Sequence, residues 1–373
     1  MNKIASFLFK CAILCALFFA SHARADLAYY VAPSQNKDSY HFLSPSFWNM
    51  VQDSLQKHSV TVYFRSGEYS DDALYLENLG NASHQLLLCG ETSTGTVFLN
   101  TTNKWAIRFI RSRNIRIKHL HFRDNIPNFA IHIQGEPDHL SSEFIIEECS
   151  FKNLTNTYYG AIGLHNFVEN VTIEKCRFDN VGSSVHAHML YASQNINGVK
   201  VTQCFLKDSM GDYVRFRNKS GNAIVVGNTF ESSASQYNRP FIEIPLFNDV
   251  NPGDEYFGNG FTIRNNSFNF FPDNNPSDNK NIAIAFENYG FEPDGVRYFL
   301  TPDEVESIGA SGISSARAIL LERTGIDASL INVSDNAYIN HREKVIYGSI
   351  DLYGSNDNRG WQGRISIYHI LDH

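Results

Sequence analysis

Long apolar runs and charged side chains are both scarce in this 373-residue chain, in which only 19% of the residues are charged. One apolar run, CAILCALFFA at residues 11–20, is too short to span a bilayer. It follows two lysines and precedes the small residues of ARA, so residues 1–25 are interpreted as a cleaved secretory signal peptide. No later segment is long and apolar enough for a membrane helix. The sequence therefore predicts a secreted or periplasmic protein without a membrane partner, and we expect a monomer.

Basic residues are also few. Removal of the predicted signal peptide takes away Lys3, Lys10 and Arg24, which leaves 28 basic residues against 39 acidic ones. A chain this acidic is a poor partner for nucleic acid. It can bind an anionic ligand only where its basic side chains gather in one place.

Two of the six cysteines belong to the predicted signal peptide, and no histidine lies at metal-ligand spacing from the remaining four. Four cysteines in an exported protein would usually indicate disulfides. Here, however, Cys149, Cys176 and Cys204 are spaced 27 and 28 residues apart, which indicates one position of a repeat used three times. We therefore interpret these cysteines as small buried residues.

Segments of eight residues recur along the chain, from IRIKHLHF at 115–122 through FIIEECSF at 144–151 to INVSDNAY at 331–338. One slot of the repeat holds a β-branched residue: Ile117, Ile146, Ile173, Val201, Val225, Ile263 and Val333. A second slot holds Leu120, Cys149, Cys176, Cys204, Asn228, Asn266 and Asn336. Alternating β-branched and aromatic residues, punctuated by Asn and Gly, predict a solenoid of strands and tight bends. Its inward columns would place the cysteines and asparagines in one stack, where the asparagines can hydrogen-bond one another.

The segments LAYYVAPSQ (27–35), VTVYFRSGEY (60–69) and LLLCGE (86–91) resemble the entry segment of bacterial proteins of the pectate-lyase-like superfamily. Between the first two, residues 44–58 fit the amphipathic capping helix of that family, with Ser44 or Ser46 as the cap. The resemblance covers almost the whole chain after the signal peptide. It implies an all-β fold, a single right-handed parallel β-helix domain over residues 26–373. The superfamily includes lyases, hydrolases, epimerases and non-catalytic binding proteins.

The repeat becomes irregular toward the C-terminus, where residues 245–260, 270–281 and 290–325 are expected to form loop or helix insertions. They are rich in Pro, Asn and Asp, and the last contains a capping-box signature that begins at Thr301. Long loops on a solenoid commonly build one side of a binding groove.

A strand ahead of each repeat segment has apolar residues at alternate positions, which indicates the residues that face outward. In YVRFR, for example, Val214 and Phe216 would face the core and Arg215 and Arg217 the solvent. The segment HMLYAS is ambiguous: with Leu190 and Ala192 facing the core, Met189, Tyr191 and Ser193 would face outward. The predicted outward track therefore carries His132, His165, Tyr191, Arg215, Arg217 and Glu243.

Cationic and titratable groups on consecutive coils fit β-elimination on a uronic-acid polysaccharide. Arg215 or Arg217 would hold the C6 carboxylate of the sugar. His165, Tyr191 or Lys207, the last placed in a bend, would exchange the proton. The candidate substrate-binding residues are His132, His188, Glu243 and Tyr159. The sequence thus predicts a secreted polysaccharide lyase whose partner is an acidic polysaccharide.

Other interpretations remain open. A glycoside hydrolase resembling polygalacturonases would need paired carboxylates, and a non-catalytic glycan-binding protein or adhesin would need only sugar-stacking aromatics such as those of NTYYG (156–160). The two arginines can also pair with Asp212 and Glu243 in a surface ladder. No cofactor is indicated: a calcium site in the bends stays open without an acidic ladder to mark it, and His186 with His188 makes zinc a minor alternative.

Overall fold

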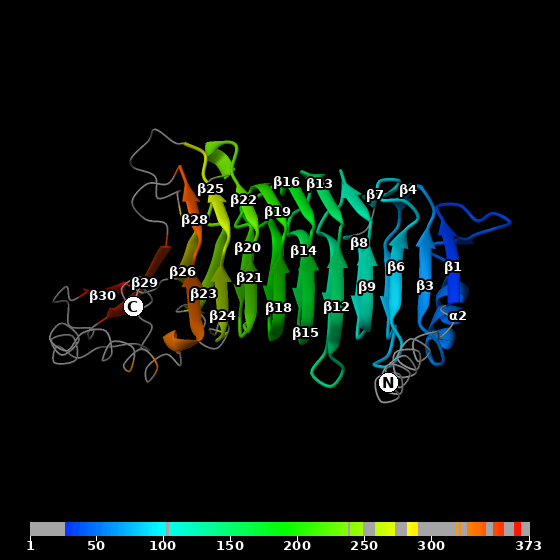
Figure 1. Ribbon diagram of the computed structural model, residues 1–373, viewed down its shortest axis with the longest axis horizontal. Coiled ribbons are helices and arrows are strands. Elements are labelled where there is room, and N and C mark those ends of the chain that lie inside the picture. The colour runs from blue at the N-terminus through cyan, green and yellow to red at the C-terminus, as the bar shows by residue number, and fades with distance from the viewer. Residues whose placement is uncertain are drawn as a thin grey trace, which may run out of the picture.

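The strands of this protein stack into an elongated solenoid that runs from the blue N-terminal coil to the red C-terminal strands (Figure 1). The computed structural model describes residues 27–101, 104–237, 239–248, 258–272, 282–289, 318, 321, 327–340, 346–353 and 362–366. The predicted signal peptide, and most of the predicted insertions, lie outside these ranges. No helix within them is long and apolar enough to cross a bilayer.

Three sheets form the walls of the solenoid, and one coil contributes one strand to each sheet. The eleven-stranded sheet contains, in spatial order, β2 (Tyr40–His41), β1 (Leu27–Ala32), β3 (Val60–Phe64), β6 (Leu86–Gly90), β9 (Arg113–Lys118), β12 (Ser141–Glu147), β15 (Val168–Glu174), β18 (Ile196–Thr202), β21 (Ala223–Val226), β24 (Phe261–Arg264) and β27 (Ile331–Ser334). The nine-stranded sheet contains β28 (Ala337–Ile339), β25 (Ser267–Asn269), β22 (Thr229–Glu231), β19 (Phe205–Ser209), β16 (Arg177–Val181), β13 (Ser150–Leu154), β10 (His121–Arg123), β7 (Thr96–Thr101) and β4 (Gly67–Asp71).

The ten-stranded sheet contains β30 (Gln362–Ser366), β29 (Ile346–Tyr353), β26 (Ile284–Tyr289), β23 (Ile242–Asn248), β20 (Val214–Arg217), β17 (His188–Ser193), β14 (Gly160–His165), β11 (Phe129–Gln134), β8 (Trp105–Ile110) and β5 (Leu74–Glu77). Neighbouring strands pair in parallel in all three sheets, except that β29 pairs with β30 in antiparallel fashion. The predicted parallel β-helix is confirmed. Because β23 continues to Asn248, the first predicted insertion does not begin at residue 245.

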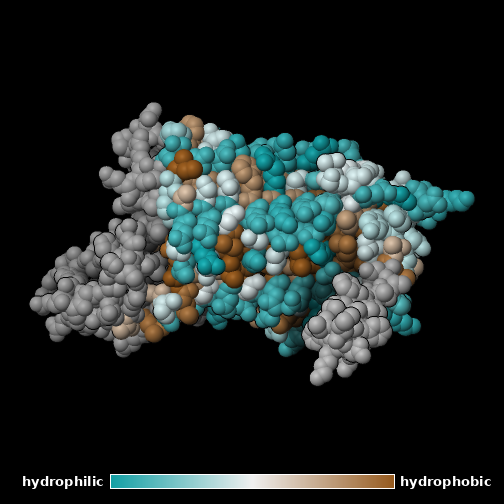
Figure 2. All heavy atoms as spheres, in the orientation of Figure 1, coloured by the Kyte–Doolittle hydropathy of each residue, from teal (hydrophilic) through white to brown (hydrophobic). Residues whose placement is uncertain are grey.

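One end of the solenoid is covered by helix α2 (Pro45–Leu55), which confirms the predicted capping helix over a slightly shorter range. Ser44 caps it, since its hydroxyl accepts a hydrogen bond from the Phe47 amide. Phe47, Val51 and Leu55 are buried, as their spacing along one helix face predicts. Short 3-10 helices occur at Ser235–Tyr237 and Ala328–Leu330. The face of the central coils shown in Figure 2 is largely hydrophilic.

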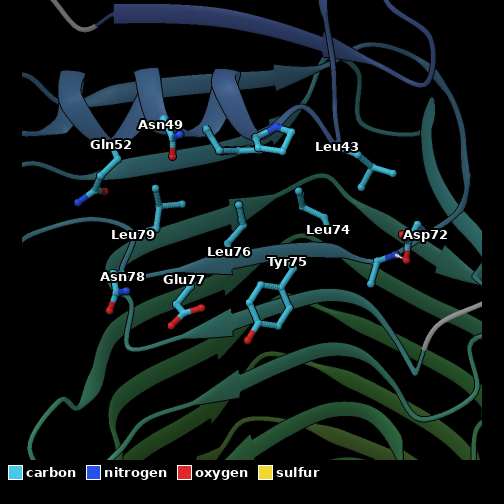
Figure 3. Close-up of a pocket in the computed structure, with 13 residues that line it drawn as sticks. Leu43, Asn49, Gln52, Asp72, Leu74, Tyr75, Leu76, Glu77, Asn78 and Leu79 are labelled. Atoms are coloured by element: carbon cyan, nitrogen blue, oxygen red, sulfur yellow. Dashed lines mark hydrogen bonds between the residues drawn. The ribbon is translucent and has the colours of Figure 1, made fainter.

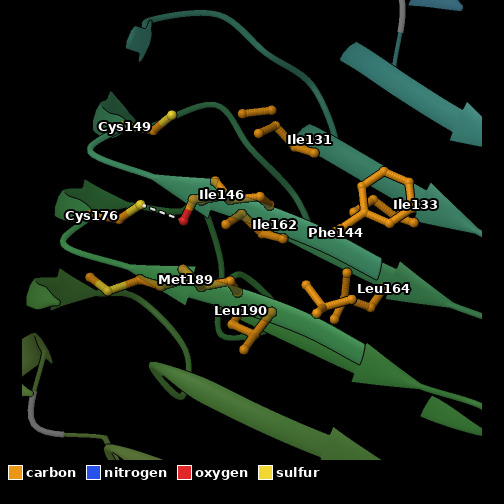
Figure 4. Packing of buried hydrophobic residues seen from close by; sticks show 14 of the residues in the cluster. Ile131, Ile133, Phe144, Ile146, Cys149, Ile162, Leu164, Cys176, Met189 and Leu190 are labelled. Carbon is orange, nitrogen blue, oxygen red and sulfur yellow. Dashed lines mark hydrogen bonds between the residues drawn. The ribbon is translucent and has the colours of Figure 1, made fainter. Parts of the chain in front are cut away.

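The predicted interior stack is present, and its cysteines are buried and reduced (Figure 4). The Cys176 thiol donates to the carbonyl of Ile146 on the preceding coil, at 3.5 Å. Asn228 donates from its amide to the corresponding carbonyl of Val201, at 2.9 Å, and also to the side chain of Asn266. Cysteine and asparagine therefore have the same role in this slot: each donates a hydrogen bond to a buried carbonyl of the preceding coil.

The residue before this slot adopts a left-handed conformation in every one of these repeats. The positive φ angles, between 50° and 68°, belong to His119, Glu148, Lys175, Gln203, Gly227, Asn265 and Asp335. A left-handed residue turns the chain sharply from the eleven-stranded to the nine-stranded sheet, at a conformational cost for residues other than glycine.

The outward prediction was wrong for Met189, which is fully buried in the core. It is the second residue of β17, level with Ala161 and Ala130 of the two preceding coils, which are buried in the core as well. At the corner where the chain enters the ten-stranded sheet, the consecutive residues His188, Met189 and Leu190 are all buried, and simple alternation fails there.

Candidate active site

The outer face of the ten-stranded sheet carries the predicted track in three parallel rows. Strand pairing aligns the middle row as Tyr75, Arg108, His132, Gly163, Tyr191, Arg215 and Glu243. A second row runs through Gln134, His165, Ser193 and Arg217. The third row contains Trp105, Phe129, Gly160 and His188. His165 therefore lies one row away from His132, because Gly163 occupies the place opposite His132.

A cleft of about 490 Å³ opens over the later coils of this face. It brings together the aromatic, imidazole and charged side chains of Tyr158, Tyr159, His186, His188, Tyr191, Asp212, Arg215, Arg217, Arg239 and Glu243, with Val185 at one edge. Six of the nine residues predicted for the site line this cleft. His165 adjoins it through its ring contact with Tyr191, at a centroid distance of 5.3 Å.

Arg215 forms ion pairs with two carboxylates of the cleft wall. Its guanidinium lies 2.7 Å from Asp212 and 2.5 Å from Glu243, and all three side chains are at least 87% buried. Burial opposes the charge of Arg215, but Glu243 and Asp212 outweigh it and raise the pKa of the guanidinium above its usual value. The ladder that the sequence left open as an alternative therefore exists for Arg215, as a buried cluster.

Arg217 has a different environment. It is half-buried, and its Nη1 donates a hydrogen bond to the Tyr191 hydroxyl at 3.2 Å. The Tyr191 hydroxyl therefore lies in the cleft with its oxygen held by Arg217.

His188 has a defined tautomer. Its Nδ1 lies 3.0 Å from the main-chain carbonyl of Asp212, and a carbonyl only accepts, so Nδ1 carries the proton and Nε2 is a bare acceptor. Burial, with the neighbouring charge of Arg215, lowers the pKa of His188 to about 3. The ring stacks on Tyr191 at 5.1 Å. His188 is therefore a neutral side chain that orients Tyr191.

His132 and His165 form a hydrogen-bonded pair, with His132 Nε2 3.0 Å from His165 Nδ1. Burial, and then the charges of His165 and Arg108, hold the pKa of His132 well below its usual range; burial and Arg108 lower that of His165 to about 4. His132 Nδ1 is buried without a hydrogen-bond partner among the described residues. An orphaned acceptor costs less than an orphaned N–H, so we assign the shared proton to His132 Nε2. His165 then carries its own proton on Nε2.

Parallel aromatic rings hold these histidines in place. His132 stacks between Trp105 and Phe129, at 5.6 and 5.5 Å, and the Phe129 ring continues the stack toward Tyr159 and Tyr191. The ring of Phe129 lies over Gly163, where a Cβ atom would come within 2.8 Å of its carbons. Gly163 therefore makes room for the ring that links the histidine pair to the cleft.

Lys207 lies outside the site. The sequence placed it in a bend beside the track, but it belongs to β19 of the nine-stranded sheet and pairs with Glu231 at 2.7 Å. Trp105, Arg108 and Arg239 were missed as outward residues near the site. The sequence could have predicted the first two, because apolar residues alternate in WAIRFI (105–110) in the same way as in FAIHIQ (129–134).

The side chains that could bind a metal ion are His, Cys, Asp and Glu. Within the part of the chain that the structure describes, no three His, Cys, Asp or Glu side chains come together as metal ligands. His186 precedes the strand that begins at His188, so the two do not alternate along one strand as expected. His186 is exposed and contacts Tyr158, while His188 is buried.

A second pocket, of about 480 Å³, lies between α2 and β5 (Figure 3). Asn49 and Gln52 of the helix face it, together with Leu74 and Leu76 of the strand. No residue predicted for the site lines this pocket.

No family model and no curated protein matches this chain. Solved structures similar to it include a pectin methylesterase in complex with a hexasaccharide, at 12% identity and a TM-score of 0.42, with 74% of this chain and 93% of that chain covered. An alginate lyase from Paenibacillus sp. str. FPU-7 shows 11% identity and a TM-score of 0.41, with 66% and 94% covered. A pectate lyase shows 12% identity and a TM-score of 0.39, with 79% and 86% covered.

Proposed function

We propose that this protein is an exported polysaccharide lyase, which cleaves a uronic-acid-containing polysaccharide by β-elimination in the cleft of the ten-stranded sheet. The observation that carries the proposal is the hydrogen bond from Arg217 to the Tyr191 hydroxyl, beside two neutral histidines. It combines a cation for the sugar carboxylate with a group that can exchange a proton.

Arg217 would hold the C6 carboxylate of the sugar at the point of cleavage. Neutralising that carboxylate makes the neighbouring C5 proton easier to remove, because the developing negative charge spreads onto the carboxylate oxygens. Arg215 suits this role less well, since it already neutralises Asp212 and Glu243. Arg215 would instead hold the cleft wall in position beside Arg217.

Tyr191 would exchange the proton. As phenolate it takes the proton from C5, the electron pair of that bond forms the C4–C5 double bond, and the C4–O bond breaks. The departing glycosidic oxygen then takes that proton from the Tyr191 hydroxyl, which restores the phenolate. The products are an unsaturated uronide and a new chain end, and no water is consumed.

The hydrolase alternative has one specific observation in its favour. Asp212 and Glu243 come from adjacent coils and meet at Arg215, so the cleft does contain paired carboxylates. A hydrolase, however, needs one of its two carboxyl groups protonated. Here both carboxylates are engaged in ion pairs with Arg215, and for this reason we place the hydrolase second.

Assays on alginate, polygalacturonate and glycosaminoglycans test the proposal. The ultraviolet absorbance of the conjugated double bond is followed in parallel with the reducing ends, in calcium and in chelator. New reducing ends without absorbance would indicate a hydrolase. Retention on a glycan column without turnover would indicate a binding protein, to which the exposed Tyr158 and Tyr159 are suited. The assay in chelator shows whether calcium is needed, together with Arg217, to neutralise the sugar carboxylate.

A further inference from the structure

The middle row of the ten-stranded sheet continues beyond the cleft toward the N-terminal end. Strand pairing places Arg108 in the same row as Tyr191, with His132 and Gly163 between them. Three coil steps separate the two residues, or about 14 Å at the usual spacing of paired strands. Arg108 is therefore a cation on the same face as the cleft but outside it.

Arg108 is held in a fixed orientation. Its guanidinium lies 4.0 Å from the ring centroid of Trp105 and 5.5 Å from that of Tyr75. Nη2 donates to the side-chain oxygen of Gln134 at 2.8 Å. Tyr75 lies on the side of β5 opposite Leu74 and Leu76 and is 48% exposed (Figure 3). Two rings and one amide thus position a cation without neutralising it.

No carboxylate of the described residues pairs with Arg108, whereas Arg215 in the same row contacts two. Burial lowers the pKa of Arg108, and among the residues that the structure describes Tyr75 opposes this effect. Its Nε is also buried without a hydrogen-bond partner among the residues that the structure describes. A half-buried cation in this state is stabilised when an anion reaches it.

We propose that Arg108, between Trp105 and Tyr75, is a second anion-binding subsite, which holds a carboxylate of the same polyuronate chain several sugars away from the one bound by Arg217. This inference rests on the proposed function. A polyuronate carries one carboxylate on each sugar, so a chain that lies along the solenoid axis presents carboxylates to both arginines. The exposed ring of Tyr75 offers an apolar surface to the sugar beside it.

The test is the variant Arg108→Gln, assayed at mildly alkaline pH, where His132 and His165 are neutral with or without the charge of Arg108. The substrate is long polygalacturonate or alginate, whichever the wild type cleaves. KM for it is expected to rise about tenfold, because the variant loses one charge-assisted hydrogen-bond pair to the substrate. kcat stays unchanged, and so does KM for oligosaccharides short enough to fill the cleft alone. Added salt is expected to weaken the binding of the long substrate less in the variant than in the wild type, because the variant has one charged contact fewer.

Arg113→Gln is the matched control, because it removes one positive charge from an exposed side chain of the eleven-stranded sheet. It is expected to leave KM for every substrate unchanged. Arg108→Lys keeps the charge without the fork of N–H donors, and serves if the glutamine variant fails to fold; its KM for long chains should be intermediate.

Equal effects of Arg108→Gln on long and short substrates, a loss confined to kcat, or no effect at all would each overturn the subsite. If the wild type binds polyuronate but does not cleave it, the lyase proposal fails while the subsite is judged by the dissociation constants of the same variants. If the wild type binds no polyuronate, both proposals fail.

Discussion

Arg217 donates a hydrogen bond to the hydroxyl of Tyr191, which lies on the preceding coil of the same sheet, at 3.2 Å. The two residues belong to neighbouring rows, so the contact depends on the stacking of consecutive coils. It places a cation beside a phenol hydroxyl on the wall of a cleft of about 490 Å³.

Tyr191→Phe removes that hydroxyl and keeps the ring that stacks on His188. We expect kcat on the preferred polyuronate to fall by a factor of about 10² to 10⁴, as is usual for the loss of a general acid–base group. KM and the melting temperature should change little. A variant that retains the wild-type kcat would remove Tyr191 from the mechanism.

The two arginines of β20 should differ in their effect on stability. The alternation in the sequence places both side chains outside the core, so replacement of either would leave the fold intact; the structure supports this expectation only for Arg217→Ala. Arg215→Ala leaves Asp212 and Glu243 buried without their counter-ion, which costs about 3–5 kcal/mol for a buried pair. Urea unfolding of both variants measures the difference. Equal midpoints would show that the Arg215 cluster contributes nothing to stability.

The low pKa of His188 makes stability depend on pH. In the unfolded chain this histidine binds a proton below about pH 6.5, whereas the folded protein resists protonation until about pH 3. Stability therefore falls as the pH is lowered, by about 2 kcal/mol between pH 7 and pH 5 for this group alone.

His188→Asn is the control for this prediction, because the asparagine amide can still donate to the Asp212 carbonyl. The variant should lose about 2 kcal/mol less than the wild type over the same pH range. Parallel loss of stability in the two proteins, measured by urea unfolding at each pH, would mean that His188 is charged in the folded protein at pH 5.

The left-handed bends give a paired prediction. Gly227 has φ of 68° and a Cβ would meet nothing within 4 Å, so Gly227→Ala tests the conformational cost alone. We expect a loss of about 1 kcal/mol. Gln203, at the same place in another coil with φ of 54°, should give a gain of similar size on replacement by glycine. Urea midpoints that stay the same in both variants would contradict a conformational cost at this bend.

Much of the fold could be predicted from the sequence, because the repeat sets the inward columns. The spacing of Cys149, Cys176 and Cys204 locates one slot of every coil, and alternation then predicts that Val214 and Phe216 are buried. Alternation acts within one strand, however, and says nothing about which of three sheets a strand joins. This is the reason that Lys207 was placed near the track although its strand belongs to another wall.

The environment of the site residues could not be predicted in the same way. His132 is an outward residue by pattern, yet it is only 6% exposed, because rings from its own and the preceding strand cover it. Likewise, Asp212 precedes its strand but turns back to Arg215. These contacts depend on side-chain size at neighbouring coils, above all on the missing side chain of Gly163.

The most direct test of the account counts double bonds against chain breaks. The purified protein is incubated with the polyuronate that it degrades, and the ultraviolet absorbance of the unsaturated product is compared with the new reducing ends at several times. Elimination in the cleft predicts one double bond for each new reducing end, and the loss of both signals in Tyr191→Phe. Reducing ends that accumulate without the double bond would contradict it.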